Sequence, residues 1–138
     1  MPATIEEMLA ILADPGTIAT VGASTNPEKP AHSVPAYLVE QEFDVRPVNP
    51  SATDILGIRT VPSLDQVDGP VTVVQVFRPA EEAPDIARQA IEAGAEVLWL
   101  QLGIVSDEAA RIAEEGGLTV VMNACMRAVH KKHVRNTP

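Results

Sequence analysis

Two kinds of apolar pattern alternate along the chain. Short runs rich in Val, Ile, Leu and Thr predict buried strands at Thr17–Val21 and at residues 43–48, 71–76, 96–100 and 118–122. Between these runs the apolar residues recur three or four positions apart, a spacing typical of helices. Such spacing is found after Thr4, over residues 32–42, over 83–91, after Ser106 and over 124–134.

Strands that alternate with helices and are apolar on both faces predict a parallel sheet covered on two sides. Because crossovers between parallel strands are right-handed, the sheet is expected to be doubly wound. We therefore predict a Rossmann-like α/β fold with about five main strands in three layers. The length of 138 residues predicts a single domain over residues 1–138. Residues 51–70 are irregular, with an edge strand expected near 58–61 and a helical turn near 63–67.

Several residues are expected to set the helix ends. Thr4 and Glu7 match a capping box, Ser106 is a candidate N-cap, and Gly94 is expected at the C′ position. Prolines at positions 27, 30 and 35 are expected to delay the helix that follows the first strand, because proline fits only the first turn.

The formal net charge of −9 disfavours general nucleic-acid binding, which requires clustered surplus Lys and Arg. The single cysteine, Cys125, excludes an intrachain disulfide and fits a reducing compartment. Residues 1–7 do not resemble a signal peptide, and no apolar stretch is long enough to span a membrane. We expect a cytoplasmic protein that binds neither nucleic acid nor membrane.

Polar residues, glycine or proline follow each predicted main strand. Ligands of doubly wound folds lie beyond the carboxyl ends of the strands, so these segments are the candidate site. Glycine at a strand end followed by a helix leaves backbone N–H groups that attract phosphate. The candidates are Gly22, Ala23, Ser24, Thr25 and Asn26, then Asn49 and Pro50, then Phe77, Arg78 and Pro79, then Gln101, Leu102 and Gly103, and finally Asn123 and Cys125. Lys29 and Arg78 are the cations placed to offset phosphate charge.

The phosphate is not expected to be that of NAD. The second glycine of the dinucleotide fingerprint is replaced by Ser24, and position 27 is proline. The acidic residue that holds the ribose of NAD at the end of the second strand is replaced by Asn49 and Pro50.

Together, the strand-end motifs resemble a known family. Residues 21–24, 48–50, 76–79, 99–104 and 122–125 are similar to those of small CoA-binding proteins. These proteins are relatives of the N-terminal CoA-binding domain of the succinyl-CoA synthetase alpha subunit. The resemblance covers residues 17–126 and implies a Rossmann-like fold that holds coenzyme A at the strand ends.

The resemblance also implies roles for individual segments. Residues 22–26 would hold the pyrophosphate, and Val48, Asn49 and Pro50 would lie along the adenosine side. Residues 77–79 and 101–103 would line the path of the nucleotide and pantetheine. In the synthetase subunit a lysine follows the strand-two proline, whereas Ser51 stands here. Lys29 is therefore an alternative phosphate contact.

No catalytic or metal-binding residue is assigned. His32 is expected at the surface or as a cap. His130 and His133 belong to a basic C-terminal run, with Arg127, Lys131, Lys132 and Arg135, that is expected to be a solvated helix end. Asp, Glu, His and Cys show no metal-ligand spacing. Cys125 is the one plausible nucleophile; it is equally expected to pack as a small apolar residue, and a mixed disulfide with CoA is a further hypothesis.

The leading hypothesis is a CoA or acyl-CoA binding protein. A second is an enzyme, either an NAD(P)-dependent oxidoreductase or an acyl transferase that uses Cys125. A third is a regulatory module that senses CoA for a protein partner; a homodimer is also compatible with a small α/β domain.

Overall fold

The computed structural model describes residues 2–135 and contains a parallel sheet of five strands. The sheet order is β2-β1-β5-β6-β7, and every neighbouring pair is parallel. Counted along the chain, this is the 2-1-3-4-5 order of a doubly wound fold, whose order reverses between β1 and β5. The predicted Rossmann-like α/β class is confirmed. The strands are β1 (Thr17–Val21), β2 (Asp44–Val48), β5 (Val73–Val76), β6 (Val97–Leu100) and β7 (Thr119–Val121).

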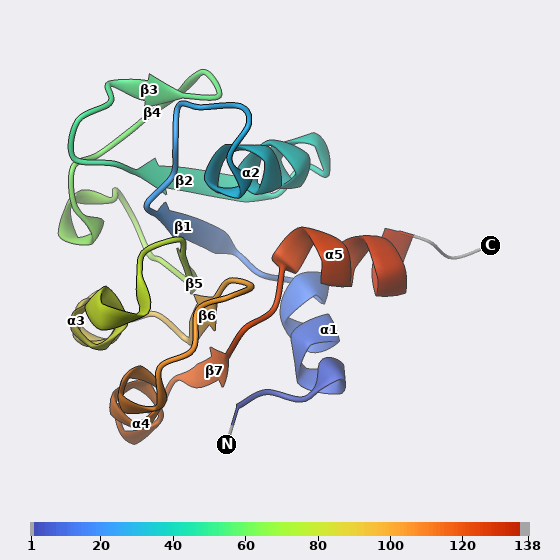
Figure 1. Cartoon of the computed structure of the whole chain (residues 1–138), viewed down its shortest axis with the longest axis vertical. Helices are drawn as coiled ribbons and strands as arrows, with labels where there is room; N and C mark the ends of the chain where they lie inside the picture. Colours follow the sequence, from blue (N-terminus) through green and yellow to red (C-terminus); the bar gives the residue numbers. More distant parts are fainter. Residues whose placement is uncertain (1, 136–138) are drawn as a thin grey trace.

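Helices cover both faces of this sheet (Figure 1). Side chains of successive strand residues point to opposite faces, so Ile18 and Ala19 belong to different apolar clusters. Ile18 and Trp99 lie on the face of the sheet that is covered by three helices. Ala19 and Leu98 lie on the opposite face, which is covered by the other two helices. The first group is α1 (Ile5–Ala13), α2 (Pro30–Glu40) and α5 (Met126–His130); the second is α3 (Ala83–Glu92) and α4 (Asp107–Glu115).

The predicted helix caps are confirmed. Thr4 and Glu7 form both bonds of the capping box, and Ser106 accepts from the N–H of Ala109 at 3.1 Å. Gly94 follows the C-cap of α3 with φ of 76°, the left-handed conformation expected at C′.

The expectation that Pro35 delays the helix after β1 is wrong. Helix α2 begins at Pro30 and contains Pro35. A proline inside a helix leaves the carbonyl four residues earlier without its usual N–H donor. That carbonyl belongs to Ala31, and it accepts instead from the N–H of Ser24 at 3.1 Å. The proline therefore frees an acceptor that attaches the β1–α2 loop to its helix.

The edge strand predicted near residues 58–61 is found in part. Residues 58–59 form β4 (Ile58–Arg59), and Val61 bridges Val48 at the edge of the main sheet, but β4 pairs in a hairpin with β3 (Asp54–Ile55), which was not predicted. Leu56 and Gly57 both have positive φ, which a two-residue hairpin turn requires. The predicted helical turn is confirmed as the 3-10 helix η1 (Leu64–Gln66).

Two more segments complete the described chain. The 3-10 helix η2 (Ala80–Glu82) precedes α3, and the π-helix η3 (Lys131–Arg135) continues α5. The final helical segment thus begins at Met126 rather than at residue 124. Among residues 2–135, no helix is long and apolar enough to cross a membrane.

Candidate functional site

Two cavities lie at the edge of the sheet where the strands end. The first cavity, of about 560 Å³, is lined by Gly22, Ala23, Val48, Asn49, Pro50 and Arg78 together with residues of η1 and α3. The second cavity, of about 490 Å³, is lined by Lys29, Phe77, Arg78, Pro79, Gln101, Leu102 and Cys125 together with residues of α2. Arg78 lies in both walls, next to the point where the strand order reverses.

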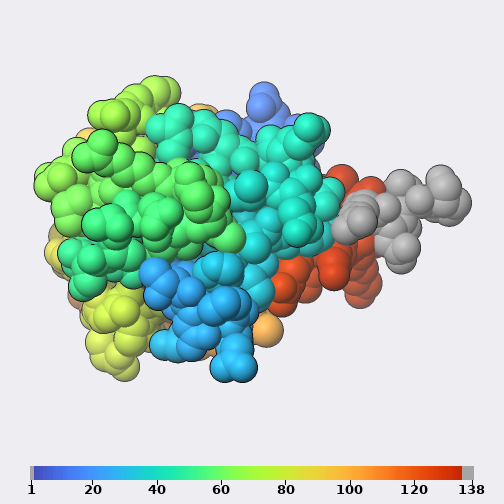
Figure 2. Space-filling model, turned by 90° about the horizontal axis from the view of Figure 1, so that it is seen from above, coloured from blue at the N-terminus to red at the C-terminus, as the bar shows by residue number. Residues whose placement is uncertain are grey.

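The structure thus brings most of the predicted site residues to these two cavities. Ser24, Thr25, Asn26, Gly103 and Asn123 are not in either wall. Figure 2 shows the blue segment after β1 adjoining the green segment that contains the β3–β4 hairpin on one face of the molecule. Segments far apart in sequence therefore form this surface.

The β1–α2 loop uses most of its backbone donors internally. The N–H of Gly22 donates to Val48 at 3.1 Å, and that of Ser24 donates to Ala31 at 3.1 Å. The N–H of Asn26 donates to the Ser24 hydroxyl at 3.0 Å. Among the described residues, the amides of Ala23 and Thr25 have no hydrogen-bond partner, but Ala23 is only 1% exposed, so the amide of Thr25 is the one that solvent reaches. The donors open to an anion are therefore fewer than the glycine turn alone predicts.

The backbone conformation at position 22 and the atoms packed against it both favour glycine there. Its φ is +88°, and a Cβ built there would lie 2.8 Å from Cδ of Arg78 and 3.0 Å from the carbonyl oxygen of Phe77. The atoms that a larger side chain at position 22 would meet first belong to the two residues that follow β5.

Asn49 connects the ends of β1 and β2. Its Nδ2 donates to the carbonyl of Ala23 at 2.9 Å. Its Oδ1 accepts from the N–H groups of Ser51 at 2.7 Å and Ala52 at 2.9 Å. Asn49 is consequently a positioning residue that fixes the loop carrying the Ala23 amide.

Arg78 is held by a carboxylate one helical turn away. Its Nε donates to Oε1 of Glu82 at 3.1 Å and its Nη2 to Oε2 at 2.7 Å. These bonds lower the pKa of Glu82 and raise that of Arg78, the hydrogen bond being the main cause for both. The two side chains are 46% and 47% exposed, so solvent and ligands reach the guanidinium.

A chain of buried polar side chains leads to the second cavity. The Thr20 hydroxyl donates to Oε1 of Gln75 at 2.8 Å, and Nε2 of Gln75 donates to Oε1 of Gln101 at 3.1 Å. The N–H of Met126 donates to the same oxygen at 3.1 Å. Sequence reasoning missed Thr20 and Gln75; the signal was a polar residue inside each of two apolar strands.

The loops after β6 and β7 hold each other. Asn123, with φ of 58°, accepts at Oδ1 from the N–H of Gly103 at 2.7 Å. Nε1 of Trp99 donates to the carbonyl of Ala124 at 2.8 Å. Leu102, at the tip of the first of these loops, is 69% exposed.

Two assignments in the basic C-terminal run need correction. Arg127 was expected to be a solvated charge, but it lines the second cavity and donates to the Ser33 hydroxyl at 3.2 Å. His130 was expected in solvent, but it is buried, with Nδ1 2.6 Å from the hydroxyl of Tyr37. Contact between α5 and α2 explains both, because a lone helix pattern does not show which face is covered.

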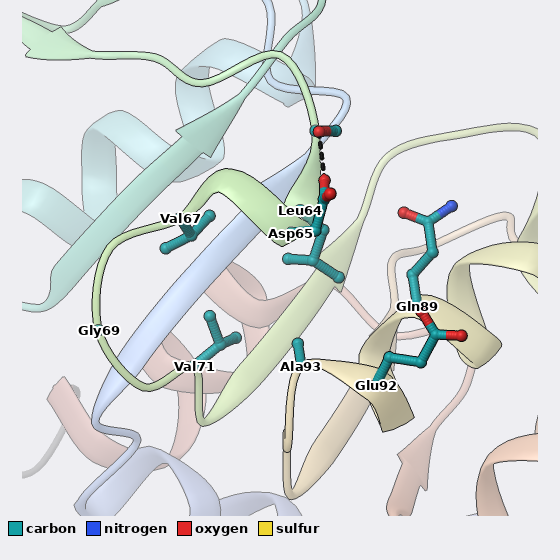
Figure 3. A pocket seen from close by; sticks show the side chains of 9 residues that line it. Leu64, Asp65, Val67, Gly69, Val71, Gln89, Glu92 and Ala93 are labelled. Carbon is teal, nitrogen blue, oxygen red and sulfur yellow. Dashed lines mark hydrogen bonds between the residues drawn. The ribbon is translucent and has the colours of Figure 1, made fainter.

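A third cavity, of about 630 Å³, lies between η1 and α3 (Figure 3). Its charged residues are the carboxylates Asp65 and Glu92, and Asp65 accepts from the Ser63 hydroxyl. It therefore does not suit a phosphate. Within residues 2–135, no group of His, Cys, Asp and Glu side chains could hold a metal ion.

Comparison with known proteins gives relatives of the same length and fold. The Bacillus subtilis (strain 168) protein called uncharacterized protein YneT is 37% identical over 124 residues, which span 90% of this chain and 92% of that protein. A hypothetical protein from Pyrococcus horikoshii OT3 has a solved structure with a TM-score of 0.91 and 37% identity, over 96% of this chain and 95% of that one.

A more distant likeness concerns the fold alone. The dinucleotide-forming acetyl-coenzyme A synthetase 1 of Ca. Korarchaeum cryptofilum gives a TM-score of 0.72 at 22% identity, over 86% of this chain and 31% of that one. Residues 16–131 match the family described as CoA binding domain. That match spans the whole sheet and every strand end described above, and the chain belongs to the CoA-binding domain family.

Proposed function

We propose that the protein binds coenzyme A or an acyl-CoA across the edge of the sheet where its strands end. The observation that carries the proposal is the placement of Arg78 in the walls of two adjacent cavities, next to the end of β1. A ligand with a charged centre and two dissimilar arms matches such a site. Coenzyme A has this form, with a diphosphate between adenosine and pantetheine.

The diphosphate is assigned to the switch point between β1 and β5. Phosphate oxygens there would accept from the guanidinium of Arg78 and from the exposed amide of Thr25 in the β1–α2 loop. Lys29 lines the second cavity and adds a second cation on that side. Because the net charge of the protein is −9, its overall charge does not attract an anion, and the affinity has to come from these local donors.

The adenosine is assigned to the first cavity, beside Val48 and Pro50. The side-chain oxygen of Asn49 already accepts from the N–H groups of Ser51 and Ala52, so Asn49 supports the loop. The adenine base is therefore assigned to the apolar side chains of this cavity. The pantetheine arm is assigned to the second cavity, whose walls include Phe77 and Leu102.

Ligand-induced thermal stabilisation tests the proposal. Coenzyme A is expected to raise the melting temperature in a concentration-dependent manner, because a ligand that binds only the folded state stabilises it. NAD(H) and NADP(H) are expected to have no comparable effect at equal concentration. Equal shifts from all these nucleotides, or none from coenzyme A, would overturn the proposal.

A further inference from the structure

Cys125 lies in the wall of the second cavity and is partly buried. The backbone on both sides of it is fixed. The carbonyl of Ala124 accepts from Trp99, and the N–H of Met126 donates to Gln101. The thiol is thus carried by a short segment that is anchored to Trp99 of β6 and to Gln101, the residue that follows this strand.

Gln101 supplies an independent sign that this cavity takes a ligand. The residue is 3% exposed, and its Oε1 accepts from both Gln75 and Met126. The N–H of Met126 can only donate, so the amide orientation is fixed and Nε2 is the remaining polar atom. Among the described residues, Nε2 has no hydrogen-bond partner.

Gln101 lines the second cavity together with Cys125. No completely enclosed side-chain nitrogen or oxygen of the described residues lacks a partner, so Nε2 has access to open space. From these two observations we infer that Nε2 is reached from the second cavity. A buried amide donor there favours a ligand with carbonyl groups, since an unmet donor is costly when water is displaced.

The pantetheine arm has this chemistry. It is uncharged, carries two amide carbonyls, and ends in a thiol. If the diphosphate lies at Arg78, the arm enters the second cavity past Phe77 and Pro79 and approaches Gln101 and Cys125. This step rests on the proposed function.

We propose that Cys125 forms a mixed disulfide with coenzyme A, and that Nε2 of Gln101 orients the pantetheine arm for it. The co-reactant is the disulfide of coenzyme A. The Cys125 thiol loses its proton to solvent, and the thiolate attacks one sulfur of that disulfide. A bond forms between the Cys125 sulfur and one CoA, the original disulfide bond breaks, and the second CoA leaves as a thiolate.

Intact-protein mass spectrometry tests the reaction on the reduced full chain. CoA disulfide is expected to add the mass of one CoA less two hydrogens, and a dithiol reductant should remove it. Adduct formation should be at least about tenfold faster than with glutathione disulfide, because bound reactants react faster than free ones. CoA lacking its sulfur should compete and slow the reaction. Equal rates with both disulfides, or no slowing by this competitor, would overturn the proposal.

Two variants separate binding from reaction. Cys125→Ser should form no adduct and still be stabilised by CoA. Gln101→Glu retains the oxygen that Gln75 and Met126 bond and removes the donor; it should lower the ratio of the CoA-adduct rate to the glutathione-adduct rate about tenfold, a ratio in which any general effect on the thiol cancels. One outcome would refute this inference alone: CoA stabilises both wild type and Cys125→Ser, but wild type reacts no faster with CoA disulfide than with glutathione disulfide. The proposed function would then stand. If CoA stabilises neither protein, the proposed function itself fails.

Discussion

The two cavities that flank Arg78 differ in charge, although they share this residue. The first cavity adds Glu81, Glu82 and Asp85 to Arg78, whereas the second adds Lys29 and Arg127. A single anionic group is therefore best held between the cavities or toward the second one. In the proposed complex, diphosphate affinity and adenosine contact would therefore depend on different residues.

The largest loss of stability and of CoA binding is expected from a larger side chain at position 22, next to Arg78, the residue that both cavities share. Gly22→Val combines an unfavourable positive φ with contact against Arg78 and Phe77. We expect a loss of about 2–5 kcal/mol in the free energy of unfolding and no detectable CoA binding. Urea denaturation and CoA titration measure the two effects.

Gly69→Val is the matched control, because Gly69 also has a positive φ, of 78°, but has no atom near its missing Cβ. Only the backbone strain remains there, at about 1–3 kcal/mol, and CoA binding should survive. Equal loss of binding in both variants would show that general destabilisation, and not this wall, explains the result.

The second largest effect concerns the shared cation. Arg78→Ala should weaken CoA binding about tenfold to a hundredfold, the value of one charge-assisted hydrogen bond. Glu82→Gln should do the reverse, because it removes the carboxylate that competes with phosphate for the guanidinium. Isothermal titration calorimetry of both variants decides whether Arg78 contacts the ligand. An Arg78→Ala protein with unchanged affinity would contradict that contact.

A smaller effect is expected on the affinity for the 3′-phosphate of CoA, which would lie at the first cavity. Among the residues that line the first cavity, Arg78 is the only cation and is assigned to the diphosphate, and Ser51 follows Pro50, so no second cation is placed there for the 3′-phosphate of CoA. Dephospho-CoA should therefore bind within about threefold of CoA. A preference for CoA above about tenfold would show that a cation from elsewhere reaches the 3′-phosphate.

The smallest effect is a pH dependence of the Arg78–Glu82 pair. Its hydrogen bonds hold the pKa of Glu82 below its ordinary value of 4.5. The stabilising contribution of the pair is thus complete above pH 4.5 and is lost as the pH falls through the lowered pKa. Wild type should lose slightly more stability than Glu82→Gln in acid denaturation curves between pH 5 and about 3. Identical slopes would show that the pair contributes nothing measurable.

Local sequence patterns predicted the sheet and its helices well. The strand at Thr17–Val21 and the caps at Thr4 and Ser106 rest on interactions within a few residues, and all agree with the structure. Pro35 was misjudged because the acceptor that it frees finds a donor on a different element, Ser24. The β3–β4 hairpin was missed because its strands have only two residues each.

The candidate site was predicted as a set of strand ends, since all parallel strands end at one edge. Their individual roles were not predictable to the same degree. Asn49 and Asn123 are residues of the kind that bind ligands, yet both hold neighbouring loops. Arg127 was expected in solvent because it belongs to the basic C-terminal run, and contact between α5 and α2 places it in the second cavity.

The sequence by itself determined the order of strands and helices, the glycine at the first strand end and the absence of an acid at the second. Those properties depend on residue type and on neighbours along the chain. Only the tertiary structure decided which amides stay free, which cation serves both cavities, and where Gln101 directs its nitrogen. Hydrogen bonds and cavity walls join residues distant in sequence, so their partners exist only once the sheet has brought them together.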